Sequence, residues 1–165
     1  MDDDLDAPRV RRRYQHRPAL DPLGPFWQGY RWSSWYAFPD LLGEGLVAVG
    51  TACGGPGIYR FAVPRRRGLL YIGQAGAIRR RLAGHARAVR DILGPGRRPH
   101  LGFHHELAAH IERGGSVRVS WISLDGMDKG DRLGIECDLI SAHRTIVGAN
   151  PAWQFLPIGG ADVDS

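Results

Sequence analysis

Residues 57–85 read GIYRFAVPRRRGLLYIGQAGAIRRRLAGH, and this stretch decides the expected fold. Residues 58–63 and 69–72 are two short apolar runs, joined by a turn of proline, arginine and glycine. That pattern is typical of a β-hairpin. Tyr59 and Tyr71 have the same parity, so both rings emerge on one face of the sheet if odd residues pair with odd residues.

A helix is predicted directly after the hairpin, from residue 77 to residue 93, where a Gly-Pro pair stops it. Its apolar stripe recurs at helical spacing. Arg81 and His85 lie one turn apart on the edge of that stripe, so they face the same side. Arg79 and Arg80 are expected to point to solvent.

Three further elements are predicted downstream. Residues 101–113 and 128–145 have helical periodicity, and residues 116–123 alternate as a strand. Glu136 lies on the apolar face of the last helix, where burying a carboxylate without a partner is costly. The expected fold class is therefore mixed α/β (α+β), a small three-stranded antiparallel sheet flanked by helices, with an N-terminal extension.

Three segments are predicted along the chain. Residues 1–50 are an extension made of a polar, proline-bearing arm and an aromatic stretch at residues 26–38, residues 51–155 form the main domain, and residues 156–165 are a tail. The aromatic stretch either packs into the core or forms a binding or dimer surface, because interfaces favour Trp and Tyr. We expect it to read the target or to make a homodimer.

The positive charge is concentrated around the hairpin. The formal net charge is +5, Lys129 is the only lysine, and Asp91 is the only acidic residue between Arg60 and Arg98. Arginine suits bidentate contacts with phosphate, so a nucleic acid is the expected partner. The candidate phosphate contacts are Arg65, Arg66, Arg67, Arg87, Arg97 and Arg98.

The cysteines, the apolar runs and the histidines indicate the cellular compartment and the kinds of site to expect. Cys53 and Cys137 fit neither a disulfide framework nor a zinc spacing, so we expect a reducing cytoplasm. No apolar run approaches the roughly 20 residues of a membrane helix, and no membrane partner is expected. His100, His104, His105 and His110 resemble a metal cluster, but no carboxylate or cysteine set completes one.

The candidate residues suit phosphodiester hydrolysis. That reaction needs an activated water, charge neutralisation on the phosphate and help for the leaving oxygen. A single carboxylate such as Glu136 can hold Mg²⁺ or Mn²⁺, which keeps most of its waters. Arg81 can bind the phosphate in a fixed geometry, and a tyrosine can orient water.

Residues 57–59 and 71–73, which read GIY and YIG, make the chain resemble the GIY-YIG nuclease superfamily. The resemblance covers about residues 56–154 and includes an arginine and a histidine on the first helix, a glutamate on a later helix and an asparagine beyond it. In this chain they fall on Arg81, His85, Glu136 and Asn150.

This resemblance implies a role for each residue in a metal-dependent DNA endonuclease. Tyr59 would be the general base or would position the attacking water, assisted by His85, and Tyr71 would orient water. Glu136 would bind one divalent metal, Arg81 would stabilise the phosphate, and Asn150 would support the site. Two alternatives stay open: a catalytically silent nucleic-acid-binding protein on the same scaffold, and a nuclease that acts on RNA.

Overall fold

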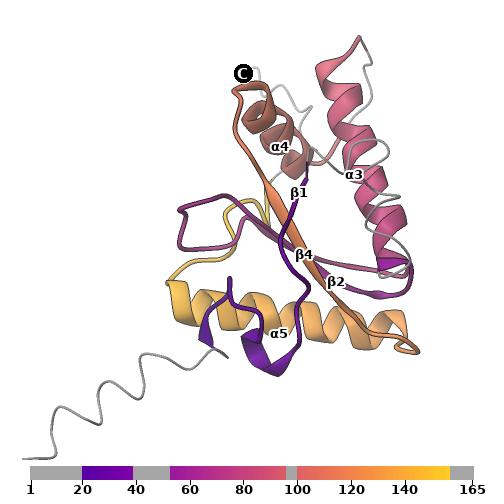
Figure 1. The fold of residues 1–165 in the computed structure, drawn as a ribbon, viewed down its shortest axis with the longest axis vertical. Coiled ribbons are helices and arrows are strands. Elements are labelled where there is room, and N and C mark those ends of the chain that lie inside the picture. Colours follow the sequence, from indigo (N-terminus) through magenta and orange to yellow (C-terminus); the bar gives the residue numbers. More distant parts are fainter. Residues whose placement is uncertain (1–19, 39–52, 96–99, 157–165) are drawn as a thin grey trace, which may run out of the picture.

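The computed structural model describes residues 20–38, 53–95 and 100–156 (Figure 1). An antiparallel four-stranded sheet has the order β1-β4-β2-β3. Its strands are β1 (Tyr36–Ala37), β2 (Gly57–Ala62), β3 (Tyr71–Ala75) and β4 (Arg118–Ser123). The helices are α3 (Ile78–Leu93), α4 (Gly102–Glu112) and α5 (Lys129–Val147), and the 3-10 turn η2 (Trp27–Gly29) precedes them.

The mixed α/β class with an antiparallel sheet is confirmed, but the sheet has one strand more than the three predicted. The additional strand is β1, which pairs with β4 through Tyr36 and Val119. The Tyr36 ring stacks on Trp121 with ring centroids 5.0 Å apart. Two residues are too few to show a period of two in the sequence, so a strand this short is visible only through its partner.

The hairpin has the parity that the sequence predicts. Tyr59 pairs with Gly73 and Phe61 pairs with Tyr71, so both tyrosines emerge on one face. A β-carbon at Gly73 would lie 2.5 Å from the Tyr59 hydroxyl oxygen, which leaves room for glycine alone. Gly57 is equally constrained, since a β-carbon there would collide with the Ile122 carbonyl of β4.

Two layers of helices cover the sheet (Figure 1). Helices α3 and α4 pack against each other and against the face that carries Tyr59 and Phe61, whereas α5 covers the face that carries Ile58 and Ile72. The ends of α5 follow local rules. The Asp128 side chain accepts the backbone N–H of residue 131 at the start, and the helix stops at a left-handed glycine, residue 148.

The segment before β1 packs on the face covered by α5 (Figure 1). Trp27 and Trp32 are buried there beside Leu139 and Ile140, and Phe38 is buried on the opposite face. Most large rings of the aromatic stretch therefore complete the two cores. Residues 1–19, 39–52 and 157–165, which include most of the predicted arm and tail, lie outside the described residues.

A buried arginine joins this segment to the sheet. Arg60 of β2 is fully buried, and its guanidinium donates to the carbonyls of Pro22 and Gly24. It also lies 4.1 Å from the ring centre of Trp32 and 4.6 Å from that of Trp35. Burial lowers the pKa of Arg60 to about 9, so the side chain stays charged at neutral pH.

Within the described residues, no helix combines the length and the apolar character needed to cross a membrane.

Candidate active site

The candidate site forms at the free edge of β3. In an antiparallel strand alternate residues point their amides outward, and at an edge these groups need other partners. The outward N–H and C=O of Ile72 are both bound by the side-chain amide of Gln154, at 2.8 Å each. The next outward backbone N–H, that of Gln74, donates to the carboxylate of Glu136.

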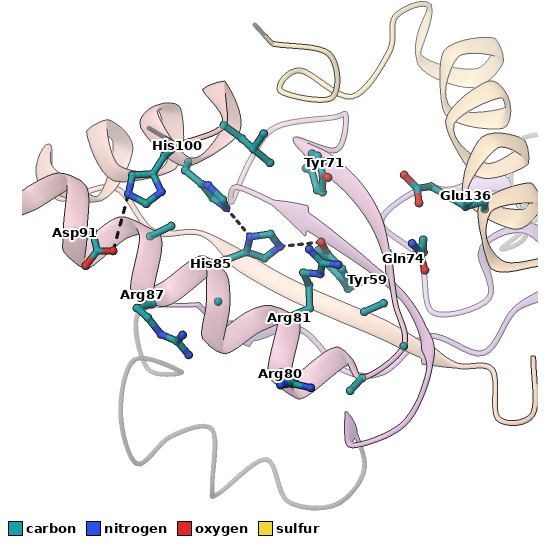
Figure 2. Close-up of a pocket in the computed structure, with 18 residues that line it drawn as sticks. Tyr59, Tyr71, Gln74, Arg80, Arg81, His85, Arg87, Asp91, His100 and Glu136 are labelled. Carbon is teal, nitrogen blue, oxygen red and sulfur yellow. Dashed lines mark hydrogen bonds and ion pairs between the residues drawn. The ribbon is translucent and has the colours of Figure 1, made fainter. Parts of the chain in front are cut away.

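Glu136 therefore reaches the site past the edge of the sheet, although α5 covers the other face. Its side chain is half-buried, and burial raises the pKa of the carboxyl group above its usual value. The Gln74 amide and the positive charge of Arg81 act in the opposite direction by stabilising the carboxylate. In Figure 2 the Glu136 carboxylate faces the tyrosines across the site.

Tyr59 and His85 form the buried part of the site. The Tyr59 hydroxyl oxygen lies 2.7 Å from Nε2 of His85, and both residues are buried (Figure 2). Burial raises the pKa of Tyr59 well above its usual value. Burial, with help from His104 and Arg81, lowers the pKa of His85 to about 3. Both groups are therefore neutral at physiological pH when no cation is bound.

Tyr71 lies beside Tyr59 with its ring centre 6.2 Å away, and it is only partly buried. Its ring stacks on Phe103 of α4 at 4.3 Å between centroids and 17° between planes, which fixes its orientation. Burial and the neighbouring Glu136 charge raise the pKa of Tyr71, so its hydroxyl stays protonated and can orient water.

A cleft of about 970 Å³ brings these groups together. Arg81 enters it from α3, His85 from one turn further along, and Glu136 from α5 (Figure 2). Arg80 and Arg87 also line it. Arg79 and Arg80 are exposed, as the sequence predicts, but only Arg79 is absent from the lining. The cleft thus joins two carboxylates, two phenols, three imidazoles and three guanidinium groups; besides the residues already named, Asp91, His100 and His104 line it.

Asn150 does not line the cleft. The preceding turn is held by His143, whose Nδ1 lies 2.8 Å from the carbonyl of Ala149 and whose Nε2 accepts the N–H of Leu69 at 2.9 Å. The Asn150 side-chain oxygen is buried without a hydrogen-bond partner among the described residues. Asn150 thus lies beyond the end of α5 and outside the lining of the cleft.

The candidate phosphate contacts divide into two groups. Arg87 lines the cleft, whereas Arg65, Arg66 and Arg67 are exposed in the β2–β3 turn and do not line it. Arg97 and Arg98 lie outside the described residues. Only Arg87 of this set is thus seen beside the candidate catalytic groups.

Three residues of the site carry no signal that sequence reasoning detected. Gln74 and Gln154 act through the edge of β3, and His104 contacts His85 from α4 with 2.8 Å between Nε2 and Nδ1. In the sequence, the run of histidines indicates His104 only as a possible metal ligand. Its position as the partner of His85 depends on how α4 packs against α3.

Near the two tyrosines the cleft offers a cation a single carboxylate, because Asp91, which also lines the cleft, lies far from Glu136 (Figure 2). No group of three or more His, Cys, Asp or Glu side chains suited to a metal occurs in the described parts of the chain. Glu136 nevertheless fits a hydrated Mg²⁺ or Mn²⁺, because such ions keep several waters and bind through one or two carboxylates. One free side of the carboxylate and the open cleft leave space for those waters.

Comparison of the chain with protein-family models, with curated proteins and with solved structures finds no match.

Proposed function

We propose that the protein is a metal-dependent endonuclease of the GIY-YIG kind that hydrolyses phosphodiester bonds in DNA. The observation that carries the proposal is the convergence of Tyr59, Tyr71, Arg81, His85 and Glu136 on one open cleft. These groups come from β2, β3, α3 and α5, so their proximity is a property of the fold and not of the sequence order. Each group also matches one requirement of phosphodiester hydrolysis.

The division of labour follows from burial. Arg81 is exposed at the cleft and binds the scissile phosphate, where it stabilises charge that develops in the transition state. Tyr71, held by its stacking on Phe103, orients the attacking water. Tyr59 takes the proton of that water while it gives its own hydroxyl proton to Nε2 of His85, 2.7 Å away.

Glu136 holds the cation in this proposal. A bound Mg²⁺ or Mn²⁺ would neutralise charge on the phosphate and lower the pKa of the attacking water. The Gln74 amide, which donates to the carboxylate, keeps Glu136 directed at the cleft in the absence of the ion. Binding of either ion should therefore need little rearrangement of α5.

The test is incubation of the protein with plasmid DNA, branched DNA and structured RNA, each with Mg²⁺ or Mn²⁺, followed by mapping of the ends. We expect DNA to be cut and EDTA to stop the reaction. Cutting of RNA alone would replace DNA as the substrate. Binding of DNA without cutting in any metal would favour the silent nucleic-acid-binding alternative and overturn the proposed activity.

Target choice needs surface outside the cleft, because phosphate contacts carry no sequence information. Trp27 and Trp32 are buried and therefore unavailable to stack on bases. Phe26 and Tyr36 are the exposed large rings of residues 26–38, and we propose them for the contact that reads DNA or forms a homodimer. Sedimentation of the wild type against Phe26→Ser tests the dimer, with a monomeric wild type as the contrary result.

A further inference from the structure

Both ring nitrogens of His85 have partners. Nε2 lies 2.7 Å from the Tyr59 hydroxyl, and Nδ1 lies 2.8 Å from Nε2 of His104. The ring is buried between α3 and α4, with Phe61 and Phe103 against its faces and edges. Tyr59, His85 and His104 therefore form one continuous row of polar groups, from the floor of the cleft to α4.

The row ends at His104. This side chain is half-buried, and its Nδ1 has no hydrogen-bond partner within the described residues. His100 lies beside it, with ring centres 5.9 Å apart, and is itself 3.9 Å from the carboxylate of Asp91. His104 is thus the last member of the row.

Each of the two short contacts holds one hydrogen, and a neutral imidazole carries one N–H. With His85 neutral, the two hydrogen bonds of its ring can therefore be oriented in only two ways. If His104 donates to Nδ1 of His85, then Nε2 of His85 carries the proton and cannot receive one from Tyr59. If His104 accepts from Nδ1 of His85, the Nε2 lone pair faces Tyr59 and can receive its proton.

We propose that His104 is a positioning residue of this cleft: it accepts the Nδ1 hydrogen of His85 and so keeps Nε2 of His85 open to the Tyr59 proton. The assignment rests on the proposed nuclease function, in which Tyr59 must lose one proton to accept another. His104 also lines the cleft, but its contact with the proposed catalytic groups is with His85, and it acts on Tyr59 through His85.

The proton transfer balances along the row. The water oxygen forms its bond to phosphorus as its proton moves to the Tyr59 oxygen, and the Tyr59 proton moves to Nε2 of His85. The Nδ1 proton of His85 can then move to Nε2 of His104. The leaving oxygen keeps the electron pair of the broken P–O bond and takes a proton from solvent. His104 returns its additional proton to solvent.

The nearby positive charges oppose a positive charge on either histidine, but burial opposes it less at His104 than at His85. Arg81 faces both histidines, His100 and His105 lie near His104, and Tyr71 with Glu136 lies on the Tyr59 side. Burial lowers the pKa of His85 to about 3, and burial with the neighbouring histidines lowers that of His104 to about 4. The half-buried ring of His104 thus bears a positive charge more readily than the buried ring of His85.

The first experiment does not depend on catalysis. The tautomer of His85 is measured by ¹⁵N NMR of the imidazole nitrogens in metal-free protein, with His85→Gln used to assign the signals. We expect a protonated Nδ1 in the wild type and in His104→Gln, whose side-chain oxygen can accept the same hydrogen. We expect this preference to be lost in His104→Phe, or in His104→Leu if the Phe variant does not fold. His105→Gln, an exposed neighbour on the same helix, is the control.

The second experiment is the rate of cutting by the same variants. Removing the outer partner of a metal-bound histidine typically costs about 10–100-fold. We expect a loss of that order for His104→Phe, with partial rescue in His104→Gln and wild-type rates in His105→Gln. A wild type that has Nε2 protonated, or a His104→Phe variant with unchanged tautomer or unchanged rate, overturns the proposal. If the wild type cuts no nucleic acid, the proposed function fails, and the tautomer comparison still decides the role of His104.

Discussion

Adjacent residues of β2 place two polar side chains on opposite faces of the same sheet, and their surroundings differ completely. Tyr59 points into an open cleft, where its hydroxyl contacts an imidazole. Arg60 points the other way, where backbone carbonyls and two tryptophan rings enclose it. A buried polar group whose partners can gain or lose protons suits catalysis, whereas one surrounded by carbonyls and rings suits stability.

Different parts of the chain pack against the two faces. The Tyr59 face draws on α3 and α4, and on Glu136 where it passes the β3 edge, whereas the Arg60 face draws on residues 20–35 and α5. Changes on the first face should therefore alter cutting with little effect on folding. Changes on the second should alter folding with little effect on cutting.

Glu136→Gln should have the largest effect. We expect cutting to fall to background, because the amide cannot hold a cation, while DNA binding and folding stay nearly unchanged. Plasmid cleavage and gel-shift assays measure the two properties. Asp138→Asn is the matched control, since this carboxylate is exposed on the same helix. Full activity of Glu136→Gln, or of the wild type in excess EDTA, would disprove the metal role.

Arg81→Ala should lose about 2.7–4 kcal/mol of transition-state stabilisation, or about 10²–10³-fold in kcat, the scale of one preorganised donor. Arg79→Ala should behave as wild type because Arg79 does not line the cleft. Single-turnover cleavage under saturating protein separates this effect from binding. A larger loss in Arg79→Ala than in Arg81→Ala would contradict the assignment.

Arg60→Met should act on stability instead. It leaves the buried carbonyls of Pro22 and Gly24 without their donor, and each such group costs about 1–3 kcal/mol, so the free energy of unfolding should fall by roughly 2–6 kcal/mol. Urea unfolding measures this change. Arg118→Met, exposed on β4, should stay within about 0.5 kcal/mol of the wild type. Loss of cutting by folded Arg60→Met would break the contrast between the two faces.

Acid should destabilise the fold through His85. Its pKa is near 6.5 in the unfolded chain and about 3 in the folded protein, so between these values the unfolded state binds more protons. This contribution to stability is full above about pH 6.5 and declines as the pH falls toward about 3. We expect a shallower decline in His85→Gln. Parallel urea titrations at several pH values test this, and identical slopes would show that His85 titrates normally.

The smallest effects should come from the exposed arginines. Arg87 lines the cleft and Arg66 lies in the β2–β3 turn. Each arginine that contacts a phosphate contributes about 0.9 to the slope of log affinity against log salt. We expect Arg87→Ala to reduce the slope by about that amount, and Arg66→Ala to do the same only if DNA extends to the turn. Fluorescence anisotropy in a salt series distinguishes the two.

The sequence by itself determined the local elements and the parity of the two tyrosines. Helices predicted at residues 77–93, 101–113 and 128–145 begin and end within two residues of α3, α4 and α5. These features follow from hydrophobic periodicity, caps and turn residues, all of which act over a few positions of the chain.

Only the tertiary structure decided which polar groups meet. His104 is 19 positions from His85, and Gln154 is 82 positions from the strand amide it covers. The carbonyls that accept from Arg60 belong to Gly24 and Pro22, which lie 36 and 38 positions earlier in the chain. No local pattern encodes such contacts, because they depend on how helices and strands pack across the sheet. For the same reason Asn150, suitably spaced in the sequence, lies away from the cleft, whereas His104 lies against its buried histidine.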